Sequence, residues 1–194
     1  AVVTATELRG GRHLDMAKEI ASECPQLQHY FVVDEEPPPG VVSFQALMDS
    51  ALDPETVHRL LEGRSFGPFE VSSVVLTSGT TGMPKCIEQM GASSKAAGRG
   101  VVERAKLTSE DVVGIIAPLS GGPGLQNWWA AFQIGARVCL LERFTPGGVL
   151  ELIERERVSY LPAIPTQLVR ILKECNVDRY DLSSLRVVRT GAAA

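Results

Sequence analysis

The sequence predicts an α/β protein with mostly parallel sheets flanked by helices. Short runs of β-branched and other apolar residues alternate with amphipathic stretches along almost all of the 194 residues, as expected for strands joined by crossover helices. Within the amphipathic stretches, apolar residues recur at helical spacing. Glycine and proline mark several of the turns between the two kinds of segment.

The first segments follow this pattern. Residues 1–4 and 29–34 are predicted strands, and residues 35–40 ("EEPPPG") are a loop, since three consecutive prolines fit neither a helix nor a strand. A helix between the two strands is indicated by residues at helical spacing, namely Leu14, Ala17, Ala21 and Cys24.

A short surface helix is predicted at 53–63. Asp53 can cap its N-terminus, Pro54 suits the first helical position, and Gly63 can end it. Next comes a strand at about 69–77, which leads directly into a loop rich in glycine and hydroxyl groups.

The rest of the chain alternates regularly between helices and strands. The predicted elements are a helix at 92–105, a strand at 111–119, a helix at 123–136, a strand at 137–141, a helix at 146–157, a strand at 158–163, a helix with Leu168, Ile171, Leu172 and Cys175 on one face, and a strand at 185–190. The composition changes near residues 107–111, which is the best candidate for a boundary between domains.

The composition excludes several classes of protein. A formal net charge of −4 provides no basic surface of the kind that binds nucleic acid. The four cysteines are far apart and form no C-x-x-C pair, so we expect buried reduced thiols rather than a zinc site or disulfides. The longest apolar run, residues 112–119, is too short to cross a bilayer, and no leader peptide precedes it. We therefore expect a cytoplasmic protein.

The loop after the strand at 69–77 is the strongest functional signal. Ligands of open α/β sheets gather at the carboxyl ends of the strands. Glycines let backbone amides turn toward a common point, hydroxyl groups add donors, and Lys85 adds a cation, which together suit a polyphosphate. The spacing differs from the Walker A pattern, because Cys86 stands where that pattern has a magnesium-binding Ser or Thr.

The string "LTSGTTGMPK" at 76–85 closely resembles the phosphate loop of the adenylate-forming superfamily, which includes acyl- and aryl-CoA synthetases, firefly luciferases and peptide-synthetase adenylation domains. Segments similar to those of the family follow in the same order at 108–124, 160–172 and 181–194. The resemblance covers essentially the whole chain. It implies portions of two adjoining α/β subdomains of the family's large N-terminal domain, which we place at residues 1–107 and 108–194.

The resemblance implies an ATP-dependent ligase that activates a carboxylic acid. The carboxylate oxygen would attack the α-phosphorus of ATP to give an acyl-adenylate and pyrophosphate, and coenzyme A would then take the acyl group as a thioester. ATP, Mg²⁺ and coenzyme A are the implied cofactors, and a small carboxylic acid is the implied substrate. Such chemistry needs positioned amides, hydroxyls and a cation rather than a nucleophilic side chain.

The resemblance also implies which residues bind these molecules, although it assigns no catalytic residue and no metal ligand within the chain. The residues expected to bind ATP are Thr77, Ser78, Gly79, Thr80, Thr81, Gly82, Lys85, Gly191, Ala192 and Ala193. We also expect Gly121 and Gly122 to border the acid substrate, opposite the backbone of residues 191–193, because small residues at strand ends leave room for a substrate to approach the backbone. Asn127, on the following helix, is a further candidate for this border.

The chain departs from the family pattern in two ways. Cys86 stands where glycine is common, and Ser120 and Gly121 stand where many members have an aromatic residue followed by histidine. The glycines could enlarge the acid site or simply form a turn. The family's magnesium-linked glutamate, ribose-binding aspartate and mobile C-terminal domain would follow Ala194, so the resemblance implies an internal piece of a longer enzyme that is inactive alone.

Two other functions remain open at this point. The parent protein could be an adenylation enzyme that loads a carrier protein instead of coenzyme A, or the chain could be a non-catalytic nucleotide-binding or interaction fragment whose loop is only a structural remnant.

Overall fold

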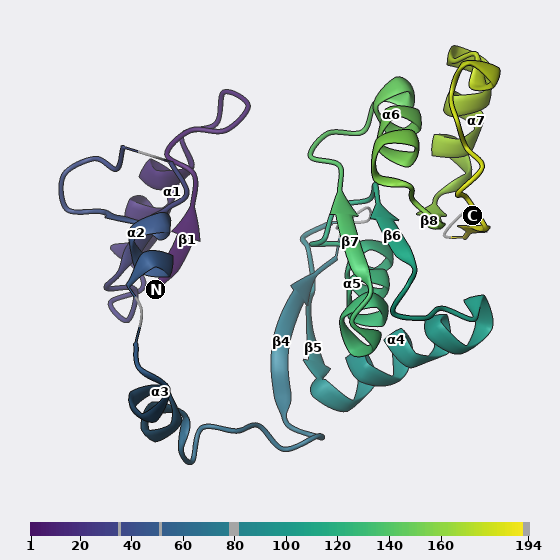
Figure 1. Cartoon of the computed structure of the whole chain (residues 1–194). Helices are drawn as coiled ribbons and strands as arrows, with labels where there is room; N and C mark the ends of the chain where they lie inside the picture. Colours follow the sequence, from purple (N-terminus) through teal and green to yellow (C-terminus); the bar gives the residue numbers. More distant parts are fainter. Residues whose placement is uncertain (35, 51, 78–81, 192–194) are drawn as a thin grey trace. The chain divides into compact units, whose positions relative to one another are not determined.

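The computed structural model describes residues 1–34, 36–50, 52–77 and 82–191. The chain divides into two compact units, residues 1–65 (unit 1) and residues 66–194 (unit 2) (Figure 1).

Unit 1 is a small parallel sheet with helices. Its strands, in the order β1-β2-β3, are Val2–Thr4, Tyr30–Val32 and Val42–Ser43. Its helices are α1 (His13–Ala21), α2 (Phe44–Asp49) and α3 (Pro54–Leu61). The sequence predicts β1, α1, β2 and α3, whereas β3 and α2 are too short to show a clear period.

The start of α3 confirms the predicted capping. The Asp53 carboxylate accepts a hydrogen bond of 2.9 Å from the backbone N–H of Thr56, and Pro54 occupies the first turn. This bond satisfies one of the backbone donors that an α-helix leaves without a partner at its N-terminus. Hydrogen bonding from the side chain and the backbone of Thr56 lowers the pKa of Asp53.

Unit 2 begins with an antiparallel hairpin of β4 (Val71–Leu76) and β5 (Cys86–Met90). Leu76 pairs with Cys86 at the end of the hairpin, so the predicted phosphate loop connects two paired strands. No strand is predicted from the sequence over Cys86–Met90, because this segment has little apolar alternation and runs directly into the next helix, α4 (Gly91–Ala105).

The main sheet of unit 2 has four parallel strands in the order β7-β6-β8-β9. These strands are β6 (Val112–Ile115), β7 (Arg137–Leu140), β8 (Tyr160–Ala163) and β9 (Val187–Thr190). The chain runs from β6 to β7 on one side and then returns past β6 to β8 and β9 on the other. This reversal creates a topological switch point at the carboxyl ends of β6 and β8.

Helices cover both faces of this sheet and close two apolar clusters. They are α5 (Gly122–Ile134), α6 (Pro146–Glu156) and α7 (Pro165–Glu174), together with α4 and a short 3₁₀ helix at Val177–Arg179. On one face, α6 and α7 contribute Leu150, Ile153 and Ile171. On the other face, α4 and α5 contribute Val101, Ala130 and Ala131, which pack with Tyr160 of β8.

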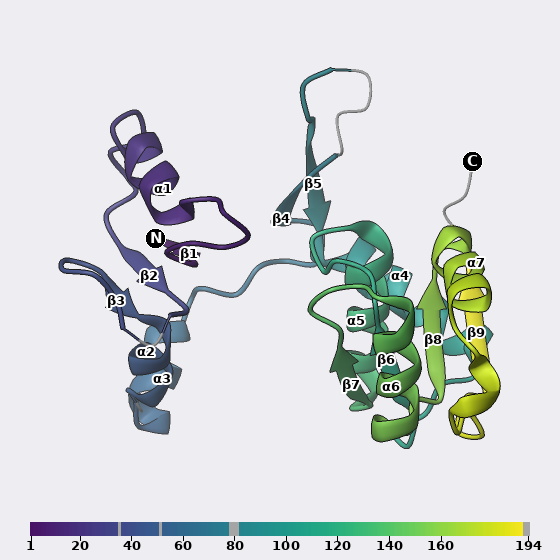
Figure 2. The same cartoon turned by 90° about the horizontal axis from the view of Figure 1, so that it is seen from above.

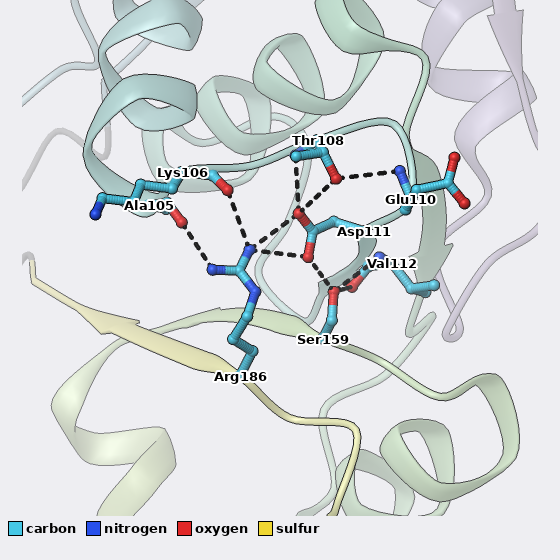
Figure 3. A network of polar contacts seen from close by, with 8 residues as sticks. All are labelled: Ala105, Lys106, Thr108, Glu110, Asp111, Val112, Ser159 and Arg186. Carbon is cyan, nitrogen blue, oxygen red and sulfur yellow. Dashed lines mark hydrogen bonds and ion pairs between the residues drawn. The ribbon is translucent and has the colours of Figure 1, made fainter.

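The amino ends of the strands are tied together by a polar network around Asp111 (Figure 3). Asp111 is only 7% exposed and precedes β6. The Arg186 guanidinium, which precedes β9, donates to both carboxylate oxygens of Asp111 at 2.9 Å, and the Ser159 hydroxyl, which precedes β8, donates at 2.7 Å. Arg186 also donates to the backbone carbonyls of Ala105 and Lys106. The network therefore fixes three strands and the end of α4 to one another at the amino ends of the strands, opposite the switch point.

The predicted boundary at 107/108 falls between α4 and β6, inside unit 2, whereas the two compact units separate at 65/66. Helix α4 packs against α5 within unit 2, because Gly98 lets the two backbones approach closely: a Cβ at Gly98 would lie 3.0 Å from the backbone N of Ala130. The division at 107/108 stays a prediction about the subdomains of a longer enzyme.

All four cysteines are free, as predicted, but they are less buried than the sequence suggested. Cys24 and Cys86 are exposed, and Cys139 and Cys175 are half-buried. Cys24 lies beyond the end of α1, and Cys86 lies on the open hairpin, so neither packs into a core.

Candidate functional site

A pocket of about 500 Å³ lies at the topological switch point of unit 2. Its floor comes from the carboxyl ends of the main strands, where Ile115 ends β6, Ala117 follows it, and Pro162 and Ala163 end β8. Thr190 and Gly191 at the end of β9 also line it. The pocket therefore occupies the position at which open α/β sheets bind their ligands.

Helices α4 and α5 and the hairpin form the walls of the pocket. Strand β5 contributes Gln89, and the first turns of α4 contribute Ser93 and Ser94. Figure 2 shows the loop-bearing end of the β4–β5 hairpin and the carboxyl ends of β8 and β9 on the same side of unit 2. A ligand in the pocket would thus lie beside the hairpin that carries the predicted phosphate loop.

The polar wall of the pocket is built around Asn127, which is 1% exposed. Its amide donates to the backbone carbonyl of Pro123 at 2.6 Å, and its carbonyl oxygen accepts from the Tyr160 hydroxyl at 2.8 Å. The Asn127 amide is thereby held in one orientation. Burial raises the pKa of Tyr160, so its phenol stays neutral and continues to donate this bond.

Arg189 of β9 completes this wall. Its guanidinium donates to the Gln126 side-chain oxygen at 3.3 Å and to the Asn127 side-chain oxygen at 3.5 Å. Gln126 is anchored in turn by donating to the backbone carbonyl of Ala97 on α4 at 3.3 Å. The wall therefore joins α4, α5 and β9 through neutral acceptors.

Gly124, in the first turn of α5, packs directly against the backbone of the preceding turn. A Cβ at this position would lie 2.2 Å from the backbone oxygen of Pro118, closer than any real carbon atom approaches. By contrast, a Cβ at Gly121 would meet that oxygen at an ordinary 3.6 Å, and a Cβ at Gly122 would meet nothing within 4 Å. Gly124 is thus the glycine that the turn between β6 and α5 requires.

The described ends of the predicted phosphate loop are joined to each other by hydrogen bonds. The Thr77 N–H donates to the Lys85 carbonyl at 3.0 Å, and the Lys85 N–H donates to the Thr77 hydroxyl oxygen at 2.9 Å. Gly82 has a φ of +151°, a conformation that residues with a side chain rarely adopt. Within the described parts of the chain, the exposed Lys85 ammonium has no acidic partner, so it is available to an anion.

The structure brings only some of the sequence-predicted residues together. Gly122, Asn127 and Gly191 line the pocket, but Gly121 does not. Thr77, Gly82 and Lys85 lie at the end of the hairpin. The remaining predicted residues lie outside the described parts of the chain, namely Ser78, Gly79, Thr80, Thr81, Ala192 and Ala193.

Sequence reasoning missed Gln126, Gly124 and Arg189. Gln126 precedes the predicted Asn127 and carries no motif. Arg189 left a usable signal, because it is a charged residue that follows two valines in the predicted strand and stands two residues before Gly191, on the same face if the extended conformation continues. In addition, both polar atoms of the Asn127 side chain make hydrogen bonds within the protein, which fixes the orientation of its amide.

The described residues hold no group of three or more His, Cys, Asp or Glu side chains that could bind a metal ion. Among the same residues, the helices are all too short or too polar to cross a membrane.

The whole chain, residues 1–194, matches the protein family described as "AMP-binding enzyme". It is 30% identical over 161 residues to 4-coumarate–CoA ligase 1 of Arabidopsis thaliana, covering 80% of this chain and 28% of the ligase. It is also 30% identical over 181 residues to the medium-chain fatty-acid–CoA ligase of Escherichia coli (strain K12), covering 93% of this chain and 31% of that enzyme. The chain thus spans about a third or less of these relatives.

Solved structures show the same fold at lower sequence identity. A red-emitting luciferase from Phrixothrix hirtus superimposes with a TM-score of 0.74 at 22% identity, over 93% of this chain and 35% of the luciferase. ATP-bound MatB from Rhodopseudomonas palustris superimposes with a TM-score of 0.74 at 19% identity, over 99% of this chain and 35% of MatB.

Proposed function

Because the chain belongs to the AMP-binding enzyme family, we propose that it is part of a longer ATP-dependent ligase that converts a carboxylic acid to an acyl-adenylate and then to an acyl-CoA thioester. The observation that carries this proposal is the pocket at the switch point, which is lined both by the hairpin that holds the phosphate loop and by the end of β9. The curated relatives, which are named as CoA ligases for 4-coumarate and for medium-chain fatty acids, support the choice of coenzyme A as acceptor.

In the proposed reaction, one carboxylate oxygen forms a bond to the α-phosphorus of ATP while the bond from that phosphorus to pyrophosphate breaks. The pocket would hold the acid, with its carboxylate at the Thr190–Gly191 end and its remainder against β6, β8 and α5. The Lys85 ammonium would bind the departing pyrophosphate, since a charge-assisted contact stabilises developing negative charge. The sulfur of coenzyme A would then attack the acyl carbon and release AMP.

We assign the roles of the predicted loop and backbone residues as part of this proposal. Thr77 and Gly82, with the loop between them, would bind the phosphates, and Gly191 with the residues after it would contact the acid and adenine. Mg²⁺, which the family implies, would be held by the phosphates and by groups beyond the described residues, because these offer no cluster of metal ligands. A cytoplasmic location, where ATP and coenzyme A are supplied, is part of the same proposal.

The proposal is tested with the full-length protein that contains this chain. We expect acid-dependent exchange of labelled pyrophosphate into ATP without coenzyme A, and formation of an acyl-CoA when coenzyme A is added. Exchange without any thioester would indicate an enzyme that loads a carrier protein. No exchange and no ATP binding with a broad set of acids would indicate a non-catalytic protein.

Lys85→Ala should lower the rate of pyrophosphate exchange by a factor that corresponds to about 2 kcal/mol, because it removes a charge-assisted contact to pyrophosphate. The matched control is Lys95→Ala, which removes the same charge from an exposed position on α4 outside the pocket lining. We expect the control to exchange pyrophosphate at the wild-type rate. Equal rates for wild type and Lys85→Ala would remove this lysine from the site.

A further inference from the structure

We propose that the acid activated by this enzyme carries a second anionic group, such as a second carboxylate, and that Arg189 binds it. This inference rests on the proposed function, since it concerns the acid that occupies the same pocket. It is carried by the position of Arg189, the weakness of its contacts within the protein and the absence of acidic residues from the described lining.

The contacts of Arg189 leave much of its hydrogen-bonding capacity unused. Its three hydrogen bonds run to neutral amide oxygens of Gln126 and Asn127 at 3.3 to 3.5 Å. Charge-assisted bonds between a guanidinium and a carboxylate are shorter, at about 2.7–2.9 Å. A guanidinium has five N–H donors in a planar fork, so an anion entering the pocket would find donors that these long contacts do not satisfy.

Arg186, which directly precedes β9, is by contrast fully partnered within the protein. It contacts both carboxylate oxygens of Asp111 at 2.9 Å and two backbone carbonyls besides (Figure 3). Arg189 has no ion pair among the described residues. The two arginines are three residues apart, yet one is used to hold the fold together and the other is left with neutral partners at a ligand pocket.

The pocket itself is otherwise uncharged. Of its described lining residues, Arg189 is the only one with a formal charge, and the remainder are apolar, glycine, serine, threonine or amide residues. Partial removal from water raises the free energy of an unpaired cation and strengthens its attraction to an anion. A pocket with one cation and no acid therefore favours an acid with a negative charge at the far end over one with an apolar end.

The position of Arg189 also sets the rough length of the substrate. Arg189 and Gly191 are two residues apart, so their Cα atoms are separated by about 7 Å if the strand conformation continues through Gly191. The reacting carboxylate is proposed to lie at the Gly191 end, which places the second anionic group several bonds away. Short linear dicarboxylic acids and aromatic dicarboxylic acids fit this spacing.

The test compares matched acids in the pyrophosphate exchange assay with the full-length protein. The linear diacids from succinate to suberate are each compared with their monomethyl ester, and terephthalate is compared with benzoate. In the wild type, we expect at least one diacid to exceed its uncharged counterpart by tenfold or more in exchange rate at low acid concentration. A wild type that uses the monoesters or benzoate as well as or better than every diacid would overturn the inference without affecting the proposed function.

Arg189→Gln should lower exchange with the preferred diacid by about 10- to 100-fold, the range expected for loss of a charge-assisted pair. Exchange with the matched monoester and the KM for ATP should stay near wild type, and Arg189→Lys should recover part of the loss. The control Arg104→Gln removes a charge from an exposed residue of α4 that does not line this pocket but lines a neighbouring one together with Arg189, and it should leave the acid preference unchanged.

Three outcomes are distinguishable from one another. If no acid supports exchange in the wild type, the proposed function itself fails. If Arg189→Gln lowers exchange with all acids equally, Arg189 binds the reacting carboxylate or only holds α5 and β9 together, and the inference is wrong. If the variant does not fold, the wild-type preference between each diacid and its monoester still decides the question.

Discussion

Replacing Asp111 with alanine is expected to lower the free energy of unfolding by about 3 kcal/mol. The substitution removes the buried carboxylate that accepts bonds from Arg186, from the Ser159 hydroxyl and from the backbone N–H of Thr108 at 2.8 Å. These donors would be left without their partner at the amino ends of β6, β8 and β9. Urea denaturation of the full-length protein measures the effect. The free energy of unfolding is taken from the first transition in which unit 2 unfolds.

The pH dependence provides an independent check on Asp111. Burial alone would raise its pKa, but the hydrogen bonds from Ser159 and Thr108 and the contact with Arg186 hold the pKa below its ordinary value. A carboxyl whose pKa is lower in the folded state stabilises the fold above the unfolded-state pKa of about 3.9, and this contribution disappears as the pH falls through the folded-state pKa.

The difference in stability between wild type and Asp111→Asn should therefore shrink as the pH falls below about 4. Asp181, whose pKa lies at about 2, is present in both proteins, so its own titration cancels in the comparison. Glu110→Gln is the matched control, because Glu110 is adjacent in sequence but exposed. A constant difference across the acid range would show that Asp111 does not act through its charge.

Replacing Gly124 with valine is expected to destabilise unit 2 by about 3 kcal/mol and to abolish acid-dependent exchange. The added Cβ would lie 2.2 Å from the Pro118 oxygen, 2.8 Å from its carbonyl carbon and 3.1 Å from the Ala117 oxygen. All three are backbone atoms, so the clash can be relieved only by moving the start of α5 and the preceding turn apart. That movement would displace Gln126 and Asn127 and with them the polar wall of the pocket.

Gly122→Val is the control for this prediction, since its Cβ would meet nothing within 4 Å. We expect Gly122→Val to retain wild-type stability, with any change confined to the acid preference because Gly122 lines the pocket. Thermal unfolding of the two variants, followed by exchange assays, separates the effects. Equal stabilities for the two variants would show that the turn after β6 adapts to a side chain at either position.

The sequence was sufficient to predict the elements with strong periodicity and clear caps. The main sheet of unit 2, for example, has all four of its predicted strands, because each is a short, largely apolar run set between a turn and a helix. The site could be located from the strand ends and from the loop at 76–85, since parallel strands place their carboxyl ends at one edge. Asp53 and Pro54 likewise begin α3 as expected.

The features that could not be predicted from the sequence depend on tertiary contacts. Strand β5 exists because Cys86–Met90 pairs with β4, and its own residues show little β pattern. Three glycines occur at 121, 122 and 124, and only the packing of Pro118 against the third distinguishes it from the others. The role of Arg189 depends on the neutrality of its neighbours, which come from α5, more than 60 residues earlier in the chain.

Helix α4 is continuous with the hairpin and closely packed on α5. It starts at Gly91, immediately after β5 ends, and at Gly98 its backbone approaches that of α5 too closely for the two helices to slide past one another without rearrangement. Such a helix behaves as a stiff rod that joins the base of the hairpin, at the end of β5 opposite the proposed phosphate loop, to the helix that lines the proposed acid pocket. Occupancy of one site should therefore alter the affinity of the other, and by thermodynamic reciprocity ATP must change the dissociation constant of the acid by the same factor as the acid changes that of ATP.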